Sequence, residues 1–371
     1  MSETIGVVVT GIGVVSPLGC SLDALVRRFA DESEEGDNGS SLLIADIPLD
    51  GVPADKRARI GRLDRLCRVF LSASHLAVDA AGLRIGNEDS ERVGLSFGTG
   101  FGCLLTNAEY YQKIVETGPA AASPRLFAYT VSSAAAGEVS IALAIKGPNA
   151  TAHMGFAAGL GAVGYAFDWI QTGKADIVLA GGADVGGPAL IAGLRDMGLL
   201  KTREQARPFA DSVPGVWPSE GAVVCVLERE EHARRRGARV WGRIDGYAAG
   251  FEPTLTRRMR ESTGIVAAMR RALRLSGHAA DAVDVVMSSA HGTPIDAVER
   301  EAMAKVFGGR DLRVRTPKVR LGETFAASGV VSLALALGTP EIQNERGASV
   351  VMVNALCYSG TIVSLLARSE P

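Results

Sequence analysis

Short, continuously apolar runs rich in valine and isoleucine alternate with alanine-rich stretches along the first two thirds of the chain. This pattern predicts buried strands between helices, because a parallel strand with helices on both faces is apolar throughout rather than at every second position. The runs are 6–15, 92–100, 175–185 and 221–229. An α/β fold is therefore predicted.

The last third of the chain repeats this order of elements. Its apolar runs are 239–250, 282–293, 312–319, 329–338 and 348–368, with a helix predicted over 295–308. No residue-level repeat is visible between the two sets, although the order of their elements is similar. The order predicts two comparable halves, 1–238 and 239–371.

The stretch 150–185 predicts a strand, a sharp turn, a helix and a second strand, with Phe156 at the turn. Apolar and small residues surround this helix on all sides, which is typical of a core helix. Enzymes place nucleophiles at such turns, because the helix dipole and free N–H groups stabilise developing negative charge. Phenylalanine has no such chemistry. A core aromatic is the simpler interpretation, but it does not account for the position at the helix start.

Two further places carry candidate chemistry. His291 follows a predicted strand, at the edge where α/β sheets bind ligands. Lys318 and Glu323 flank a tight turn before another helix of small residues, and an ordinary ion pair is the alternative interpretation. The glycine-rich pieces at 98–103 and 181–187 do not have the spacing of phosphate-binding loops, so no nucleotide site is predicted.

Composition narrows the function classes. The chain has 371 residues, 47% of them hydrophobic, and a net charge of -2, so no overall basic field favours nucleic acid or an anionic membrane. The five cysteines lack CxxC spacing and histidine partners, which predicts reduced thiols, no metal and no cofactor. No secretory leader or apolar run of bilayer length is present, which predicts a cytoplasmic protein.

Several longer pieces resemble one family in their sequence, order and spacing. They include VVVTGIGVVSPLG, VSSAAAGEVSIALAIKGP, GLGAVGYAFDWIQTGKADIVLAGGADV, SSAHGT and VNALCYSG. Over nearly its whole length the chain resembles the β-ketoacyl-acyl-carrier-protein synthases of the condensing-enzyme group. The resemblance implies a thiolase-like fold, with two βαβαβαββ halves in five layers (α-β-α-β-α) and dimerisation through the first half.

Members of that family use a cysteine on the strand-to-helix turn, two histidines and a lysine. Aligning their turn with 153–164 places Phe156 at the nucleophile. The first histidine matches His291, the lysine matches Lys318, and the second histidine falls on Glu323. A glutamate cannot replace a neutral imidazole that donates to a thioester carbonyl, so no independent condensing activity is expected.

Two loops of the family are also altered. The second threonine of its HGTxT motif is absent, because Pro294 follows Thr293 directly. Both threonines contact the pantetheine arm in the family, so arm binding is predicted to change. The gating loop, GFGG in active enzymes, reads CYSG at 357–360 and is predicted to be less flexible. The resemblance places the oxyanion-type backbone N–H groups at Phe156 and Tyr358.

Ketosynthase-like subunits without the cysteine, called chain length factors, pair with an active ketosynthase in bacterial type II polyketide systems. The resemblance implies this role here, with a catalytic ketosynthase and an acyl carrier protein as partners and an aromatic or polyene product. Those subunits usually carry glutamine at the nucleophile position. Phe156 instead offers only apolar surface and is expected to fill the pocket.

The resemblance also indicates surfaces. The region 110–136 matches the family's tunnel floor and interface, and the residues predicted to line it are Phe127, Tyr129, Ser132 and Ser133. The residues predicted to dock the acidic carrier protein are Arg62, Arg65 and Arg207. Three more arginines enlarge the first basic cluster, namely Arg57, Arg59 and Arg68.

Two alternative functions stay open at this point. In the first, His291 and Glu323 form an acid–base pair in an acyltransferase or cyclase that works without a covalent cysteine. In the second, the chain is a lone homodimeric acyl-binding protein. A cavity containing both side chains favours the first, and indifference to every ketosynthase favours the second.

Overall fold

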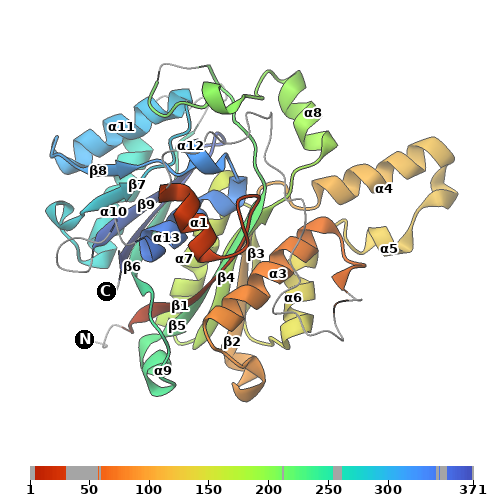
Figure 1. The fold of residues 1–371 in the computed structure, drawn as a ribbon, viewed down its shortest axis with the longest axis horizontal. Helices are drawn as coiled ribbons and strands as arrows, with labels where there is room; N and C mark the ends of the chain where they lie inside the picture. Colours follow the sequence, from red (N-terminus) through yellow and green to blue (C-terminus); the bar gives the residue numbers. More distant parts are fainter. Residues whose placement is uncertain are drawn as a thin grey trace.

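Ten strands form one mixed sheet in the computed structural model, which describes residues 5–30, 57, 60–210, 213–253, 261–339, 342 and 349–369 (Figure 1). The strands are β1 (Val7–Val15), β2 (Val93–Gly98), β3 (Asn149–Ala152), β4 (Ile177–Asp184), β5 (Gly221–Arg229), β6 (Gly242–Phe251), β7 (Val285–Met287), β8 (Arg313–Arg315), β9 (Val350–Leu356) and β10 (Thr361–Ser369). The helices are α1 (Leu22–Ala30), α3 (Arg65–Ala80), α4 (Leu104–Thr117), α5 (Pro124–Phe127), α6 (Ala134–Leu143), α7 (Ala158–Gln171), α8 (Pro188–Asp196), α9 (Glu230–Arg235), α10 (Thr263–Ser276), α11 (Pro294–Phe307), α12 (Lys318–Leu321) and α13 (Ser328–Gly338).

The strand order is the same in the two halves when each is read outward from the middle of the sheet. The first half runs β1-β5-β4-β2-β3, and the second runs β6-β10-β9-β7-β8. The pairing directions match as well: the two inner pairs of each half are antiparallel and the two outer pairs are parallel. A short antiparallel contact between β1 and β6 joins the halves. The predicted duplication is therefore present as topology.

Helices separate and cover the two half-sheets. Both α7 and α13 contact strands of both halves, so they form the central layer. One outer layer contains α3 and α6 on the first half-sheet, and the other contains α10, with α11 beside it, on the second (Figure 1). Three buried apolar clusters fill the spaces between these layers. This is the predicted five-layer α/β arrangement.

One predicted run has a different secondary structure. Residues 329–338 were grouped with the strands by their apolarity, but they form most of α13, and all but one of their side chains are buried. A short apolar run cannot distinguish a central strand from a helix buried on every side. The run 348–368 contains both β9 and β10, joined by the turn at 357–360. The division of the chain at residue 238 stays a prediction.

The sheet has two edge strands, and one helical segment projects from the body of the protein. The sheet ends at β3 in the first half and at β8 in the second. The arm, which we define as residues 104–127, contains α4 and α5 and projects from the body (Figure 1).

Candidate functional site

The turn that carries Phe156 is a short helical segment, η4 (Gly155–Ala157), between β3 and α7. Gly155 has a φ of 56°, a conformation that favours glycine. A Cβ at Gly155 would also collide with Cys357 Sγ, so glycine is required for space as well. The turn therefore delivers Phe156 to the N-terminal end of α7, as the sequence predicts.

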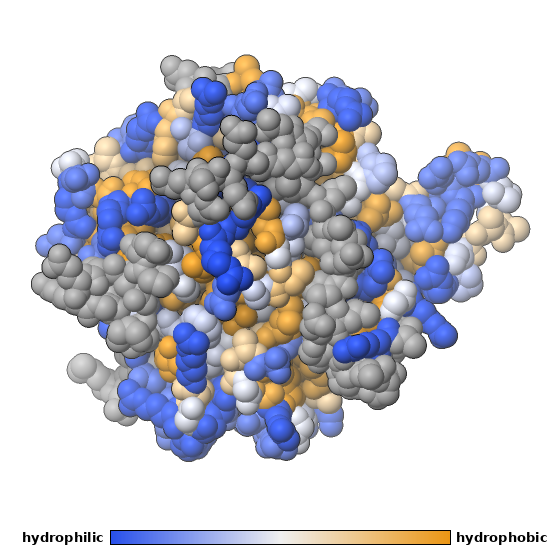
Figure 2. Space-filling view, viewed as in Figure 1, coloured by the Kyte–Doolittle hydropathy of each residue, from blue (hydrophilic) through white to orange (hydrophobic). Residues whose placement is uncertain are grey.

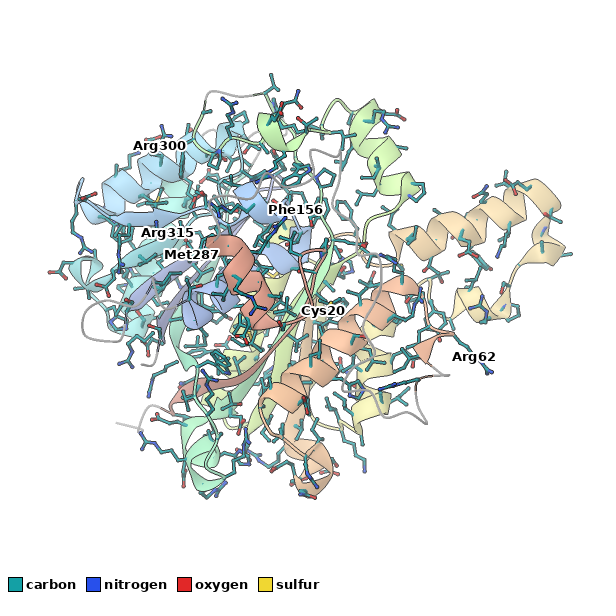
Figure 3. All side chains as sticks on the ribbon, viewed as in Figure 1. Cys20, Arg62, Phe156, Met287, Arg300 and Arg315 are labelled. Carbon is teal, nitrogen blue, oxygen red and sulfur yellow. The ribbon has the colours of Figure 1, made fainter. Side chains whose placement is uncertain are left out.

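An aromatic cluster surrounds the half-buried Phe156 ring. Its centroid lies 5.2 Å from that of Phe325, 5.9 Å from that of Tyr358 and 6.4 Å from that of Phe101. Phe101 and Phe325 pack edge to face, with their centroids 4.8 Å apart. Such tilted contacts are the favoured geometry for aromatic rings. The position expected for a nucleophile is thus part of an apolar cluster, near the centre of the molecule in Figure 3.

The second half contributes an equivalent turn. The segment η7 (Phe325–Ala327) precedes α13 just as η4 precedes α7, so Phe325 takes the place of Gly155 in the duplicated order. Phe325 has a φ of 52° and is fully buried. A phenylalanine in this region carries backbone strain, which surrounding contacts must offset. The sequence analysis missed Phe325 and Phe101, although both lie in glycine- and alanine-rich pieces that it examined.

A buried carboxylate joins the segment after β2 to the turn η7. Asp184, at the end of β4, accepts hydrogen bonds from the Thr99 hydroxyl at 2.7 Å and from the backbone N–H groups of Phe101 and Ala326 at 2.9 Å each. Burial raises the pKa of this carboxyl group. Asp184 therefore fixes the positions of the Phe101 and Phe325 rings relative to each other.

His291 lies after β7, with 5% of its surface exposed. Its Nδ1 lies 3.0 Å from the Ser289 carbonyl oxygen, which can only accept, so Nδ1 carries a proton. Its buried Nε2 has no hydrogen-bond partner within the described chain. Burial, and then the Lys318 ammonium, lower the pKa of the imidazole. His291 is therefore neutral at pH 7, with a free lone pair on Nε2.

Glu323 and Lys318 form a buried ion pair beside it. Lys318 Nζ donates to Glu323 Oε2 at 2.7 Å and to Ser289 Oγ at 3.0 Å. Glu323 Oε1 accepts from the Phe325 N–H at 2.9 Å and from the Ser328 hydroxyl at 2.5 Å. Burial opposes ionisation of Glu323, but the Lys318 ammonium and the hydrogen bonds from Lys318 and Ser328 hold the pKa of Glu323 below its ordinary value.

These partners determine what Glu323 can do. His291 Nε2 lies 3.8 Å from Glu323 Oε2, beyond a hydrogen bond. An ionised carboxylate only accepts hydrogen bonds, and both oxygens of Glu323 are already engaged. The structure thus brings His291, Lys318 and Glu323 together as the sequence predicts. It gives Glu323 the bonding of a structural anion.

Both altered loops are held in place by hydrogen bonds. Thr293 is 1% exposed, and its hydroxyl donates to Asp296 Oδ1 at 3.1 Å. In the turn at 357–360, the Gly360 N–H donates to the Cys357 carbonyl at 2.9 Å, and the Tyr358 hydroxyl contacts the Gly215 backbone. Burial raises the pKa of Tyr358. An oxyanion role for the N–H groups of Phe156 and Tyr358 stays a prediction.

An apolar pocket of about 710 Å³ opens in front of Phe156. Phe101 and Phe156 line one side, the turn at Cys357 and Tyr358 another, and Leu190 and Leu194 of α8 a third. None of the described lining residues is charged. Figure 2 shows apolar side chains gathered over α8. The sequence analysis did not identify α8 as a pocket wall, because an amphipathic helix does not reveal which cavity it faces.

The predicted tunnel residues lie around α5 and the start of α6. Phe127 is 62% exposed and packs near Tyr110, with ring centroids 6.0 Å apart. The Tyr129 hydroxyl donates to Glu138 Oε1 at 3.3 Å, Ser132 Oγ lies 3.8 Å from Cys103 Sγ, and Ser133 is exposed. None of the four is among the described lining of the pocket at Phe156. Their tunnel role stays a prediction.

The three predicted docking arginines differ in their exposure and in their bonding partners. Arg62 and Arg207 are exposed, with Arg207 Nε donating to the Glu204 carbonyl at 3.0 Å. Arg65 forms an ion pair with the buried Glu220. Arg125, which the sequence analysis missed, donates to the Arg62 carbonyl at 3.3 Å. Arg57 is exposed, Arg68 is half-buried, and Arg59 lies outside the described residues. Carrier docking stays a prediction.

Metal binding needs a cluster of ligating side chains, and membrane insertion needs a long apolar helix. No group of three or more His, Cys, Asp or Glu side chains within the described ranges has an arrangement that could hold a metal ion. No helix there has the length and apolarity needed to cross a bilayer.

Two family models and several curated relatives are similar in sequence to this chain. The β-ketoacyl synthase N-terminal domain model matches residues 49–233, and the C-terminal domain model matches 241–339. The mitochondrial 3-oxoacyl-[acyl-carrier-protein] synthase of Arabidopsis thaliana is 32% identical, over 88% of this chain and 79% of its own length. The 3-oxoacyl-[acyl-carrier-protein] synthase 2 of Staphylococcus aureus is 30% identical, over 89% of this chain and 84% of its own.

Solved structures of similar shape support the fold. The ishigamide ketosynthase/chain length factor has a TM-score of 0.84 at 23% identity, covering 100% of both chains. A ketosynthase in complex with its type II PKS acyl-carrier protein has a TM-score of 0.81 at 20% identity, also covering 100% of both. A β-ketoacyl synthase from Burkholderia phymatum has a TM-score of 0.84 at 23% identity, covering 99% of this chain and 100% of its own. The predicted thiolase-like fold is confirmed.

Proposed function

This chain belongs to the β-ketoacyl synthase family, and from that premise we propose that it is a non-condensing, chain length factor-like subunit that pairs with a catalytic ketosynthase. The observation that carries the proposal is Phe156 at the turn before α7. Its ring packs against Phe325 and Tyr358, where acyl transfer needs a thiolate. The chain cannot form the covalent acyl intermediate at that position.

The bonding of Glu323 supports the same proposal. Decarboxylative condensation needs donors that stabilise an enolate. Glu323 offers none, because it is ionised and engaged by Lys318, Ser328 and the Phe325 N–H. Two of the positions that the family uses for chemistry have thus become parts of the packed core. This favours a retained scaffold with a new task over a site damaged at one residue.

The two edges of the sheet support pairing through the first half. The β8 edge has arginines at both ends of its short strand, and edge charges discourage strand addition. The β3 edge, Asn149–Ala152, carries no charge. Large apolar side chains are more than half exposed on the arm and on the segment that leads into and through α6, namely Tyr111, Val115, Phe127, Val131 and Ile141. Exposed apolar surface of this kind is typical of a partner interface.

The tunnel and the carrier protein belong to the same proposal. The arm would place Phe127 and Tyr129 against the partner, where they would limit the length of the growing chain. Exposed Arg62, Arg125 and Arg207 would attract an acidic acyl carrier protein that serves the partner. The structure of similar shape that contains a carrier protein and its ketosynthase is consistent with this assembly.

No observation specifically favours either of the two alternative functions. An acyltransferase or cyclase built on His291 and Glu323 would need Glu323 to exchange protons, yet Lys318 and Ser328 occupy its oxygens. The described lining of the apolar pocket includes Phe156 but neither His291 nor Glu323. A lone homodimeric acyl-binding protein is separated from the proposal by the experiment below.

The test is co-expression with cysteine-bearing ketosynthase homologues from the same genome, followed by native mass spectrometry. We expect a one-to-one heterodimer with one of them. Ile141→Glu should weaken pairing by at least about 10-fold, because it places a charge on the apolar surface near β3. Leu275→Glu is the matched control, since Leu275 is 61% exposed on α10 and Ile141 is 63% exposed.

Two outcomes would contradict the proposal. A homodimer that ignores every ketosynthase would favour the lone acyl-binding protein. Equal weakening by Ile141→Glu and Leu275→Glu would show that pairing does not use the first half.

A further inference from the structure

A second pocket, of about 430 Å³, lies far from Phe156 and has no part in the proposed function. It forms where β8 and α12 meet the C-terminal ends of α1 and α13. The lining residues that matter are Phe29, Arg315, Thr316, Val319, Arg320 and Thr339. Figure 3 shows Arg315 and Arg62 on opposite sides of the molecule, with Phe156 between them.

Two guanidinium groups give this pocket a positive charge. Arg315 is exposed, and its guanidinium has no hydrogen bond or ion pair within the described chain. Arg320 Nη1 donates to the Phe29 carbonyl at 2.9 Å, which holds that side chain at the pocket wall. None of the described lining residues is acidic. The charged side chains of the described lining are therefore both positive, which favours an anion.

An unsatisfied hydroxyl also points to a polar ligand. Thr339, the residue after α13, is 2% exposed, and its Oγ1 has no hydrogen-bond partner within the described ranges. A buried hydroxyl without a partner is unfavourable, so such groups are rare unless a water molecule or a ligand satisfies them. Thr316 provides a second hydroxyl in the lining.

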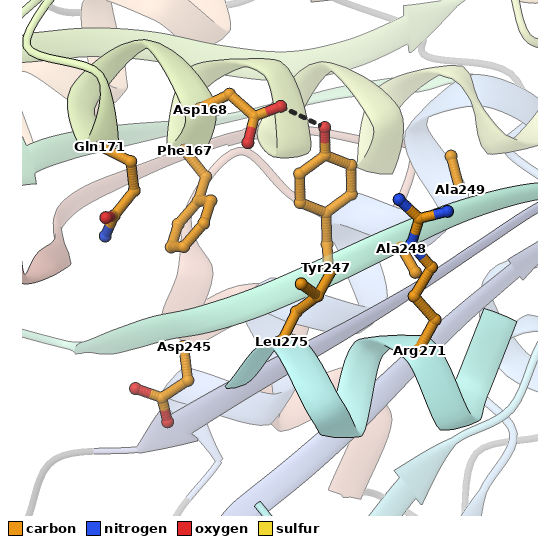
Figure 4. Close-up of a pocket in the computed structure, with 9 residues that line it drawn as sticks. All are labelled: Phe167, Asp168, Gln171, Asp245, Tyr247, Ala248, Ala249, Arg271 and Leu275. Carbon is orange, nitrogen blue, oxygen red and sulfur yellow. Dashed lines mark hydrogen bonds between the residues drawn. The ribbon is translucent and has the colours of Figure 1, made fainter. Parts of the chain in front are cut away.

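The pocket in Figure 4 is a natural comparison, because it has a similar volume of about 460 Å³ and one arginine, Arg271. Its lining also contains Asp168 and Asp245. Asp168 accepts a hydrogen bond from the Tyr247 hydroxyl at 2.6 Å. The described lining of this pocket thus contains two carboxylates and one guanidinium, whereas that of the pocket at Arg315 and Arg320 contains two guanidinium groups and no carboxylate.

We propose that the pocket lined by Arg315, Arg320 and Thr339 binds a phosphate monoester with an uncharged organic group. Phosphate suits the site, because guanidinium groups bind its oxygens in bidentate geometry and the hydroxyls can donate to it. Phe29 and Val319 offer apolar surface to the organic group. Nothing in this inference depends on pairing with a ketosynthase.

Isothermal titration calorimetry of the full chain tests the proposal, with butyl phosphate and inorganic phosphate as probes at constant ionic strength in chloride. We expect one site per chain and tighter binding of butyl phosphate. Arg315→Ala should weaken binding by at least about 10-fold, because it removes a charge-assisted contact. Thr339→Val, which keeps the side-chain shape, should weaken it by about 3-fold. Arg271→Ala should leave it unchanged.

Three results would overturn the inference. The first is no heat of binding at millimolar probe. The second is equal loss in Arg315→Ala and Arg271→Ala, which would mean nonspecific ion pairing. The third is equal affinity for both phosphates, which would remove the role of the apolar wall. Arg315 is exposed, so its substitution should not prevent folding, and Thr339→Val provides an independent variant.

Discussion

At the scale of single residues, Phe156 and Glu323 stand at positions that the resemblance matches to reactive residues, and both make structural contacts there. Phe156 joins the rings of Phe325 and Tyr358, and Glu323 joins Lys318 in a buried ion pair. Removing one partner of such a pair typically costs about 3–5 kcal/mol, because the other charge stays buried. Ring packing holds Phe156 and an ion pair holds Glu323, so the two changes can be reversed separately although both residues contact Phe325.

Restoring the nucleophile alone should separate the two steps of condensation. In Phe156→Cys, we expect a covalent acyl adduct on incubation with acyl-carrier-protein thioester, because the thiol would lie at the N-terminal end of α7. Decarboxylative condensation should stay absent, because Glu323 cannot donate to the enolate. The double variant Phe156→Cys/Glu323→His should condense.

Intact-protein mass spectrometry detects the adduct, and mass spectrometry of the carrier protein detects the β-ketoacyl chain that condensation forms. Phe156→Ala is the control, since it opens the same space without a thiol. Equal condensation by the single and double variants would show that Glu323 does not block the reaction.

At the scale of elements, the arm and the turn at 357–360 serve different surfaces of the fold. The arm exposes Tyr111, Val115 and Phe127 to a partner, whereas the turn packs Cys357 against Gly155 and Tyr358 against Phe156. Changes in α5 should therefore affect the assembled complex and leave the core of the single chain intact.

Shortening the side chain of Phe127, at the end of α5, or of Tyr129, two residues later, should change product length. Phe127→Ala and Tyr129→Ala each enlarge the surface that the proposal places at the end of the tunnel, so the co-expressed pair should make products longer by at least one extension unit. Liquid chromatography with mass spectrometry of the products gives the answer. Leu275→Ala, at an exposed site on α10, is the control. Unchanged lengths in both variants would remove the tunnel assignment.

At the scale of the whole molecule, buried titratable groups link folding stability to pH. Burial and Lys318 hold the pKa of His291 below its ordinary value of 6.5. The unfolded chain therefore binds a proton that the folded chain does not as the pH falls below 6.5, and stability declines. Glu323 adds to the decline at lower pH, because its folded-state pKa lies below 4.5 and the ionised form stabilises the fold.

Urea unfolding between about pH 7 and 5 measures this linkage. We expect His291→Asn to reduce the slope of the free energy of unfolding against pH, by up to about 1.4 kcal/mol per pH unit. His153→Asn is the control, because His153 is exposed. An unchanged slope in His291→Asn would mean that this histidine does not set the acid sensitivity.

The sequence by itself determined the class of fold and singled out the candidate site residues. Continuous apolar runs indicate strands buried on both faces, although the predicted parallel pairing is wrong for β1, β5, β6 and β10, which pair only antiparallel. The turn before α7 could be aligned on its glycines. Phe156, His291, Lys318 and Glu323 were all identified in this way, and the structure brings them together. Local patterns suffice for these features because strand burial and turn geometry depend mainly on neighbouring residues.

Only the tertiary structure decided what those residues contact. The run at 329–338 became a helix rather than a strand, because a core helix and a core strand are equally apolar. Phe101, Phe325 and Leu190 approach Phe156 from distant parts of the chain, and no local pattern encodes such contacts. Glu323 Oε2 likewise pairs with Lys318 Nζ at 2.7 Å rather than with His291 Nε2 at 3.8 Å, and these distances exist only in the folded protein.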